Sequence, residues 1–421
     1  MGANDSKSAI GTWKSAMATI GNSSIFPVTV HAMKTARVNK RGATRVRQGH
    51  LWIYKSDVVE VDADRGSIVF VTDEGGNFIG QAFYSDASQI ALRFLTLGKE
   101  EIDREWWRQR IRQCNARRQL PADTNAFRLI YSEGDLLPSL IVDRYADVLV
   151  LQTLSQGTES VKSLISELLI EEFSPRAIIE RNDARVRQLE GLPLVATTLF
   201  GSAPEEFEIL QHGLRFLVAP SGGQKTGSFL DQRENRLAAR AAAQTTKRGR
   251  ALDCFTFNGA FALHLASVCE KVVGIDISND AIQAAERNAQ LNEISNVEFR
   301  EANVFDALRE MEMSGEHFDT IVLDPPAFAK NRASLKSALR GYKEINLRAL
   351  KLLNPGGVLI TCTCSYHVSE DLFLEIIAAA AVDAKRRVQI VEKRMQASDH
   401  PVLVGMPETY YLKCVIARVL A

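Results

Sequence analysis

Strand-like and helix-like stretches alternate through about the second half of the chain, from residue 209 to the end. Amphipathic helical spacing occurs over Ala260–Cys269 and Asn279–Leu291, between short apolar runs of strand length. These runs are Ala251–Phe255, Lys271–Asp276, Val297–Phe299, Phe318–Asp324 and Gly357–Cys362. Strands separated by helices predict a parallel, doubly wound α/β sheet, in which ligands bind at the carboxyl ends of the strands.

Residues 28–100 follow a different pattern, with short β-rich runs separated by Gly and Asp turns. The runs are Gly66–Val71, Phe78–Tyr84 and Gln89–Phe94. Turn residues at this spacing predict a small β-barrel or sandwich.

Residues 101–208 mix the two patterns. Asp103–Gln119 has the spacing of an amphipathic helix, and strand-like segments at 140–152 and 177–180 flank a helical stretch at 161–172. We therefore expect a mixed α/β unit that links the β-rich region to the doubly wound region.

The composition is that of an ordinary globular protein. Of the 421 residues, 46% are hydrophobic and 24% are charged, so two or three domains are expected. No apolar run approaches the ~18 residues that cross a bilayer. Residues 1–27 are polar and rich in Ser and Ala, and we expect a flexible tail rather than a signal peptide. An organellar transit peptide stays open, although the segment is poor in Arg.

The six cysteines show no Cys-x-x-Cys pair, so neither a zinc site nor any other bound metal is expected. A chain of this size also has no need of disulfides to hold its core. We therefore expect a reducing compartment, the cytoplasm.

The net charge of zero hides an asymmetry. From Ser6 to Ser56 the chain has no acidic residue. The basic residues in that stretch are Lys7, Lys14, Lys34, Arg37, Lys40, Arg41, Arg45, Arg47 and Lys55. Two interpretations stay open: a solvated basic tail, or a surface that binds the phosphates of a polyanion such as RNA.

Acidic and amide side chains stand at the carboxyl ends of four predicted strands. The first strand ends in Asp253-Cys-Phe-Thr-Phe-Asn-Gly259, whose single late glycine would let a ligand approach the backbone but is not a dinucleotide motif. Asp276 ends the second strand, where an acid suits ribose hydroxyls. Asn303 follows the third strand and would accept from an adenine amino group, and the rigid turn Asp324-Pro-Pro-Ala-Phe328 follows the fourth. Any one of these residues alone is about as often a helix cap or turn former.

Together, the four strand ends resemble those of class I S-adenosylmethionine-dependent methyltransferases. Three further segments resemble parts of RNA methyltransferases that carry a PUA domain. Arg45–Tyr54 is similar to the opening of the PUA domain, Tyr131–Tyr145 to the linking domain, and Gly223–Arg236 to the segment before the first strand of the methyltransferase domain. The resemblance runs from about Val28 to the C-terminus, and its motifs are specific in combination. The family that the chain resembles is the PUA-containing bacterial large-subunit (23S) rRNA cytosine-C5 methyltransferases.

The resemblance implies a PUA-like RNA-binding domain at 28–100, a linking domain at 101–208 and a methyltransferase domain at 209–421. It implies S-adenosyl-L-methionine as cofactor and large-subunit rRNA as partner, and it leaves a homodimer open. Phe229, Asp231 and Arg233 would close the site around the methionine end of the cofactor; without the resemblance, they suggest a helix start with surface charges. The implied cofactor-binding residues are Phe229, Asp231, Arg233, Asp253, Phe255, Gly259, Asp276, Ile277, Asn303, Val304, Asp324 and Pro325.

The fifth predicted strand ends in Thr361-Cys-Thr-Cys-Ser-Tyr366. Strand alternation puts Cys362 and Cys364 on the same side of the strand, with Cys364 nearer its end. A free cysteine is most often an inert core residue, which is our interpretation of Cys362, Cys254 and Cys269. By the resemblance, Cys364 is the catalytic nucleophile.

The implied chemistry needs a sulfur nucleophile, because carbon 5 of cytosine does not attack a methyl donor unaided. A thiolate that adds at C6 makes C5 enamine-like; C5 then attacks the sulfonium methyl, a base removes the C5 proton and the thiol leaves. A free thiol, with a pKa of about 8.5, is only slightly ionised at neutral pH, so the site should favour the thiolate. The resemblance assigns Asp324 to the N3 edge of the ring. The structural alternative is that Asp324 only orients the Pro-Pro turn.

One position departs from the pattern. Many RNA cytosine-C5 enzymes have a second cysteine directly after Pro-Pro, and this chain has Ala327 there. The group that assists product release is therefore not identified. Tyr342 is interpreted as core rather than base-stacking, and His400 as structural, in a region where class I enzymes place a late β-hairpin.

Two other functions fit parts of the sequence. Asp-Pro-Pro-x-Phe also resembles motifs that align exocyclic amines, so a guanine or adenine N-methyltransferase, which needs no sulfur nucleophile, is the second hypothesis. A non-catalytic RNA-binding or ribosome-assembly factor is the third. The joint presence of Asp253, Asp276, Asp324 and Cys364 argues against it.

Overall fold

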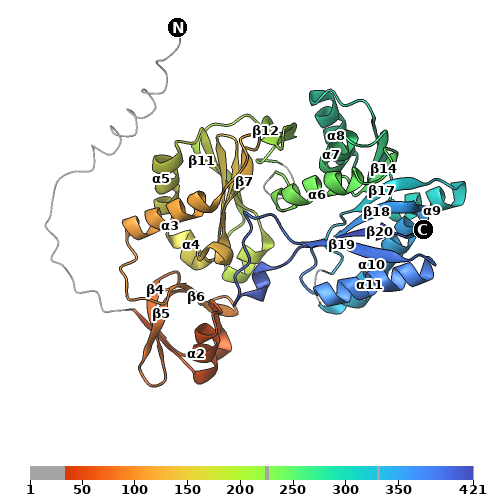
Figure 1. The fold of residues 1–421 in the computed structure, drawn as a ribbon. Helices are drawn as coiled ribbons and strands as arrows, with labels where there is room; N and C mark the ends of the chain where they lie inside the picture. The colour runs from red at the N-terminus through yellow and green to blue at the C-terminus, as the bar shows by residue number, and fades with distance from the viewer. Residues whose placement is uncertain (1–33, 223–226, 330–331, 421) are drawn as a thin grey trace, which may run out of the picture. The chain divides into compact units, whose positions relative to one another are not determined.

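Four β-sheets organise the described part of the chain, residues 34–222, 227–329 and 332–420 of a computed structural model (Figure 1). The tail expected at 1–27 lies outside the described residues, and so does part of the Gly223–Arg236 motif. No helix in the described ranges is long and apolar enough to span a membrane.

The first sheet has six strands in the order β2-β6-β5-β4-β1-β3. The elements are β1 (Thr35–Val38), α2 (Lys40–Arg47), β2 (Trp52–Tyr54), β3 (Val58–Asp62), β4 (Ile68–Asp73), β5 (Phe78–Tyr84) and β6 (Ile90–Thr96). The strands predicted from turn spacing are present, but helix α2 was not predicted. Its surface is basic, and only Gly42, Ala43 and Val46 are buried. Asn39 caps the helix by accepting from the Gly42 amide at 2.9 Å.

The middle of the chain forms a five-stranded sheet, β11-β10-β9-β8-β7, and a separate hairpin of β12 and β13. The elements are α3 (Arg104–Arg117), β7 (Ala126–Tyr131), β8 (Leu140–Tyr145), β9 (Val148–Thr153), α4 (Gln156–Ser160), α5 (Lys162–Phe173), β10 (Ala177–Asn182), β11 (Val195–Gly201), β12 (Phe207–Gln211) and β13 (Leu214–Val218). The strand-like segment 140–152 is two antiparallel strands, because the chain reverses at Ala146, where φ is 55°. The side chains that α3 buries are the apolar ones of its predicted face: Trp106, Trp107, Ile111 and Cys114.

The last sheet has seven strands in the order β16-β15-β14-β17-β18-β20-β19. The elements are α6 (Arg233–Ala243), β14 (Arg250–Cys254), α7 (Ala260–Ala266), β15 (Lys271–Asp276), α8 (Asn279–Leu291), β16 (Val297–Glu301), α9 (Val304–Ser314), β17 (Phe318–Leu323), α10 (Leu335–Leu352), β18 (Leu353–Thr363), α11 (Glu370–Asp383), β19 (Val388–Arg394) and β20 (Lys413–Val419). Strands β14 to β18 are parallel, as predicted. Strands β20 and β19 extend the sheet in antiparallel fashion. His400 lies in the connection between these two strands and not on either of them.

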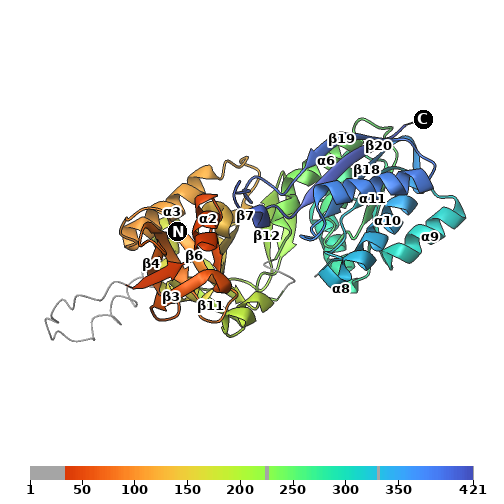
Figure 2. The same ribbon diagram turned by 90° about the horizontal axis from the view of Figure 1, so that it is seen from below.

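The seven-stranded sheet is covered on both faces, as a doubly wound sheet requires. Helices α9, α10 and α11 pack on one face, and α6 and α7 pack on the other. In Figure 2, α10 and α11 run side by side along the sheet. Because β14 to β18 are parallel, their carboxyl ends meet at one edge, where the predicted site residues begin.

A further apolar core joins the middle sheet to the last one. Its members include Tyr145 and Val150 of the middle sheet, Phe216 of the hairpin, and Leu230 and Leu263 near the start of the seven-stranded unit. The middle sheet therefore packs beside the segment that leads into α6.

Candidate active site

The turn after β14 is held in a strained conformation. Phe255 and Phe257 have φ angles of 63° and 50°, a left-handed region that costs a non-glycine residue about 1–2 kcal/mol. Two hydrogen bonds maintain it: Phe257 N donates to Asp276 Oδ2 at 3.0 Å, and Thr256 Oγ1 donates to Asp253 Oδ2 at 2.6 Å. Strain of this kind is concentrated at ligand sites.

Gly259 ends this turn with a φ of 81°, and a Cβ there would lie 2.9 Å from Phe299 Cζ and 3.1 Å from Ala285 Cβ. The missing side chain therefore makes room for packing against β16 and α8. A ligand that approaches the backbone of Gly259 would have to do so from another side, and that approach stays a prediction.

Asp253 is a buried carboxylate with one unsatisfied oxygen. Oδ2 accepts from Thr256 Oγ1 and from the Ala262 amide, whereas Oδ1 is buried with no hydrogen-bond partner among the described residues. Burial raises the pKa of Asp253 to about 7. A cationic ligand group, such as the ammonium or sulfonium of S-adenosylmethionine, would satisfy this oxygen. The site thus fits the charge of that cofactor.

The strand ends of β15 and β16 offer groups for an adenosine. Asp276 accepts from Phe257 N and Ser278 N, so its carboxylate is oriented and keeps lone pairs for ribose hydroxyls. Ile277, next to it, is 67% exposed and presents an apolar surface.

Asn303 and Val304 follow β16 and begin α9. The oxygen that was expected to accept from adenine, Asn303 Oδ1, instead caps α9 by accepting from Phe305 N at 2.9 Å. Val304 has its side chain in the core, which leaves only its backbone to contact a ligand.

The segment before α6 lies over the turn after β14. The ring of Phe229 packs edge-to-face on Phe257, with centroids 5.0 Å apart. Asp231 Oδ2 accepts from the Tyr411 hydroxyl at 2.6 Å. Phe229 therefore borders the strained turn, whereas Asp231 is held by Tyr411 from the β19–β20 connection.

Arg233 has a structural partner. It is buried, and its Nη1 donates to Asp399 Oδ2 at 2.6 Å. The same Asp399 oxygen accepts from the Arg128 amide at 2.8 Å, and its other oxygen lies 2.9 Å from His400 Nδ1. Arg233 thus ties the start of α6 to the β19–β20 connection, and His400 is structural, as interpreted.

Asp324 is half-buried at the end of β17. Gln232 Nε2 donates to its Oδ1 at 2.8 Å, and Gln232 Oε1 accepts from Asn235 Nδ2 at 2.6 Å. Because Asn235 occupies the oxygen of that amide, the amino group of Gln232 must face Asp324. Pro325, the next residue, is buried. Gln232 is a site residue that the sequence reading did not single out.

Cys364 differs from the other cysteines of the chain. All six lie in described residues; the other five are buried, and Cys364 is partly exposed. It follows β18 directly and packs on the same side as Cys362, as strand alternation predicts. Since β17 and β18 pair with Leu323 opposite Thr361, Asp324 and Cys364 lie at the carboxyl ends of neighbouring strands.

The Tyr342 hydroxyl braces the chain around Cys364. It accepts from Thr363 Oγ1 at 2.8 Å and lies 2.9 Å from Ser365 Oγ. Phe328 N, at the end of the Asp-Pro-Pro turn, also donates to it at 3.5 Å. Tyr342 is a core residue, as interpreted, but its hydroxyl also positions the residues on both sides of Cys364.

Lys413 was missed by the sequence reading. It begins β20 opposite Thr363, and its side chain is buried. Burial lowers the pKa of Lys413, while attraction to Cys364 and Glu370 opposes that shift. A buried ammonium beside Cys364 favours the thiolate form of the cysteine. No local pattern marks Lys413, because it lies far from Cys364 in the sequence.

Comparison with known proteins agrees with this architecture. Residues 36–97 match the family described as a PUA-like domain, and residues 245–401 match a methyltransferase domain. The chain is 40% identical to ribosomal RNA large subunit methyltransferase I of Enterobacter sp. (strain 638), over 88% of this chain and 96% of that protein. This chain belongs to the ribosomal RNA large subunit methyltransferase I family.

A second member of the family, from Shewanella denitrificans, is 41% identical over 88% of this chain and 95% of its own length. Among solved structures, a methyltransferase in complex with S-adenosylhomocysteine superposes with a TM-score of 0.79 at 20% identity, over 92% of this chain and 100% of that one. A SAM-dependent methyltransferase from Streptococcus mutans gives 0.77 at the same identity and coverage. The expected fold, a class I methyltransferase unit preceded by a PUA-like domain, is confirmed.

We predict that Asp276→Ala weakens binding of S-adenosylhomocysteine about 10- to 100-fold. The reason is that hydrogen bonds to a charged group contribute about 1.5–3 kcal/mol, and 1.4 kcal/mol is a factor of ten. Isothermal calorimetry of the full chain measures the effect. The matched control is Asp280→Ala, because Asp280 is an exposed carboxylate in the first turn of α8. This variant should bind S-adenosylhomocysteine as wild type does. Equal affinity of the two variants would contradict the assignment of Asp276.

Proposed function

We propose that this chain methylates carbon 5 of a cytosine in large-subunit rRNA, with Cys364 as the nucleophile. The observation that carries the proposal is the partly exposed Cys364 at the end of β18, beside Lys413 and next to the strand that ends in Asp324. The family relatives, which are named ribosomal RNA large subunit methyltransferase I, support rRNA as the substrate. The boundaries 28–100, 101–208 and 209–421 are part of the proposal.

S-adenosylmethionine supplies an electrophilic methyl group on its sulfonium. Asp253 would face a cationic group of this cofactor, Asp276 would accept from its ribose hydroxyls, and Ile277 would pack on its adenine. Phe229 and Asp231 would border its methionine end. These roles follow the hydrogen bonds and burial described above.

The sulfur of Cys364 adds to C6 of the cytosine as a thiolate, and Lys413 stabilises that anion. Negative charge then develops at N3 of the ring, where the protonated carboxyl group of Asp324, oriented by Gln232, donates a hydrogen bond. C5 takes the methyl group and loses its proton to a base, after which the C6–sulfur bond breaks and the thiolate returns. Many RNA cytosine-C5 enzymes have a second cysteine directly after Pro-Pro that assists product release. This chain has Ala327 there, so another base or water takes that role.

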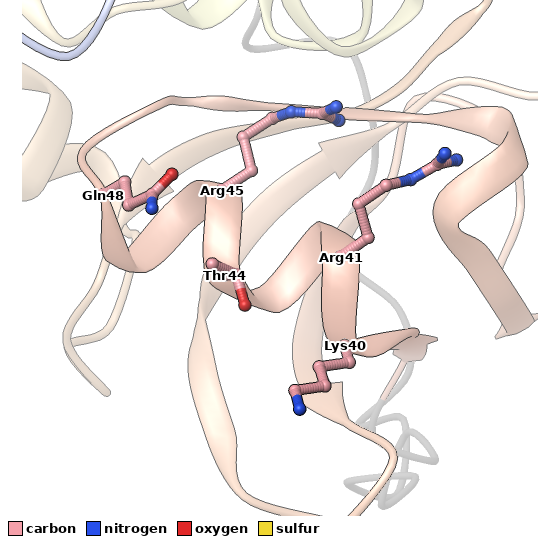
Figure 3. Close-up of a pocket in the computed structure, with 5 residues that line it drawn as sticks. All are labelled: Lys40, Arg41, Thr44, Arg45 and Gln48. Carbon is pink, nitrogen blue, oxygen red and sulfur yellow. The ribbon is translucent and has the colours of Figure 1, made fainter.

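RNA binding is proposed for the face of α2. A groove of about 520 Å³ is lined by Lys40, Arg41, Thr44 and Arg45 of this helix and by Gln48, its C-terminal cap (Figure 3). Its charged lining residues are all basic. Buried Asp57 accepts from Arg41 Nε and Arg45 Nη1 and so fixes the two guanidinium groups. Fixed arginines in such a groove suit phosphate oxygens.

Mass-spectrometric mapping of large-subunit rRNA, from cells with and without this protein, tests the proposal. The expected result is one 5-methylcytosine that disappears without the protein and returns with wild type. Loss of an N-methylated purine instead would favour the second hypothesis. An unchanged set of modified bases would contradict methyl transfer to this RNA.

We predict that Lys413→Met lowers methyl transfer at pH 7 about tenfold and moves the rising limb of its pH profile upward. The ammonium favours the thiolate, and a change of one pKa unit in a thiol changes the thiolate fraction about tenfold. Burial lowers the pKa of Lys413. As the pH rises, Lys413 should therefore lose its positive charge, and with it the stabilisation of the thiolate, at a lower pH than an exposed lysine would. Rates of Cys364 alkylation by iodoacetamide against pH give an independent measurement. Lys271→Met, which changes a lysine at the amino end of β15, is the control. If the pH profile of Lys413→Met were identical to that of wild type, Lys413 would have no part in stabilising the thiolate.

A further inference from the structure

A second cavity, of about 450 Å³, lies where the middle sheet meets the segment before α6. Arg128 and Gln152 line it from β7 and β9, and Arg181 lines it from β10. The remaining lining residues are Asp183, Ala184, Ser228, Phe229, Leu230, Asp231, His400 and Tyr411. Its size is in the usual range of small-molecule sites.

Two lining residues of the cavity connect it to residues near the proposed reacting groups, although none of the reacting groups lines it. Asp231, in its wall, precedes Gln232, which donates to Asp324 at 2.8 Å. Tyr411, also in its wall, accepts at its backbone oxygen from Lys413 Nζ at 3.3 Å. The chain segments that wall the cavity therefore also carry Gln232, which contacts Asp324, and Lys413, which lies opposite Thr363.

The charges of the lining do not suit a phosphate. Two arginines and two aspartates balance each other, in contrast with the all-basic lining of the α2 groove. Arg181 Nη2 is 2.9 Å from Asp183 Oδ2, and Arg128 is held by both oxygens of Asp143 at 2.8 and 2.9 Å. A neutral ligand with hydrogen-bonding edges fits this balance better than an anion does.

The remaining features suit a flat, hydrogen-bonding ring. Phe229 and Tyr411 supply aromatic surfaces. The Arg128 side chain is 15% exposed, and its Nη1 has no hydrogen-bond partner among the described residues, so it can donate to a ligand. Proteins recognise RNA bases that are splayed out of a stack through this combination of aromatic rings, arginine planes and polar groups.

We infer that this cavity binds a nucleobase that flanks the target cytosine in the RNA. The inference rests on the proposed RNA methyl transfer. It gives the middle domain a direct part in substrate recognition: β7, β9 and β10 hold the neighbouring base while Cys364 and Asp324 act on the target. Loss of the stacking and edge contacts to one base typically weakens RNA binding about 10- to 100-fold.

Ala184→Trp fills the cavity without removing any side-chain hydrogen bond. Ala184 is half-buried in the lining, with an extended backbone (φ −71°, ψ 129°) that any residue adopts. Ala184→Ser leaves the cavity open and is the matched control. We expect Ala184→Trp to weaken binding of a large-subunit rRNA transcript about tenfold in filter binding at fixed salt, and to lower kcat/KM for that RNA by a similar factor. Ala184→Ser should bind S-adenosylhomocysteine within about twofold of wild type. Because Phe229 and Asp231 line the cavity and are also proposed to border the cofactor, the test for Ala184→Trp is that its loss of cofactor affinity is smaller than its loss of RNA affinity.

Abasic scanning identifies the base. In a short RNA that contains the methylated cytosine, nucleotides around the target are replaced one at a time by abasic residues. One position should lower wild-type kcat/KM about tenfold, with no further loss in Ala184→Trp. Normal RNA binding by Ala184→Trp, an equal loss of cofactor affinity, or no sensitive abasic position would overturn the inference. If wild type forms no 5-methylcytosine, the proposed function fails by itself, and the filter-binding comparison still decides whether the cavity holds RNA.

Discussion

Cys364→Ala should lower the rate of methyl transfer at least about a thousandfold, because C5 of cytosine does not become nucleophilic until a thiolate has added at C6. The measurement is incorporation of radiolabelled methyl groups from S-adenosylmethionine into a large-subunit rRNA transcript. Cofactor affinity should stay near that of wild type, since Cys364 is not among the groups assigned to the cofactor. An enzyme that methylates an exocyclic amine would keep most of its activity in this variant.

Cys362→Ala is the matched control for this experiment. Cys362 lies two positions earlier on the same side of the strand, but it is buried and packs against Cys414, its partner across β18 and β20. Its replacement should lower stability modestly and leave the rate within a few-fold of wild type. Equal rates in the two alanine variants would remove Cys364 from the mechanism.

The covalent step can be observed with RNA that carries 5-fluorocytosine. After methyl transfer, the fluorine at C5 does not leave as a proton does, so the C6–sulfur bond persists. Wild type and Cys362→Ala should form a protein–RNA band that survives denaturing electrophoresis, and Cys364→Ala should form none.

Asp324→Asn should reduce kcat about 100-fold or more and leave cofactor affinity within about threefold. An amide keeps the hydrogen bond from Gln232 and can still donate to N3, but it has no acidic proton to transfer to the charge that develops there. Effects of 10²–10³ are typical when one such group is lost. Single-turnover kinetics with saturating RNA separates this loss from weaker binding.

Asp306→Asn provides the comparison for Asp324. Asp306 is an exposed carboxylate in the first turn of α9, and its replacement should leave kcat unchanged. If Asp324→Asn were as active as this control, Asp324 would have only the structural role of orienting the Pro-Pro turn.

Periodicity and turn spacing predicted most elements well because those signals are local. The bounds of β5, β15 and α8 agree with the predicted ranges. The parallel direction of β14 to β18 follows from strands that alternate with helices. Helix α2 was missed, since few of its residues face the core and its composition is mainly basic.

Individual site residues were harder to assign than strand ends. The sequence indicates that Asn303 and Gly259 lie at the correct edge of the sheet, but it does not indicate their partners. In the structure, Asn303 Oδ1 caps α9 and the space beside Gly259 is filled by Phe299. A side chain at a strand end can serve the ligand or the fold, and the choice depends on which residues arrive from elsewhere in the chain.

The amino-acid sequence alone was enough to place a cysteine and an acid at the carboxyl ends of two parallel strands, because strand period and chain order determine both positions. Only the tertiary structure decided that these strands are neighbours, that Lys413 lies opposite Thr363 beside Cys364, that Gln232 faces Asp324, and that the middle sheet walls a cavity. The physical reason is distance along the chain: these contacts join segments that pack together only after the apolar cores have formed, and no local pattern encodes them.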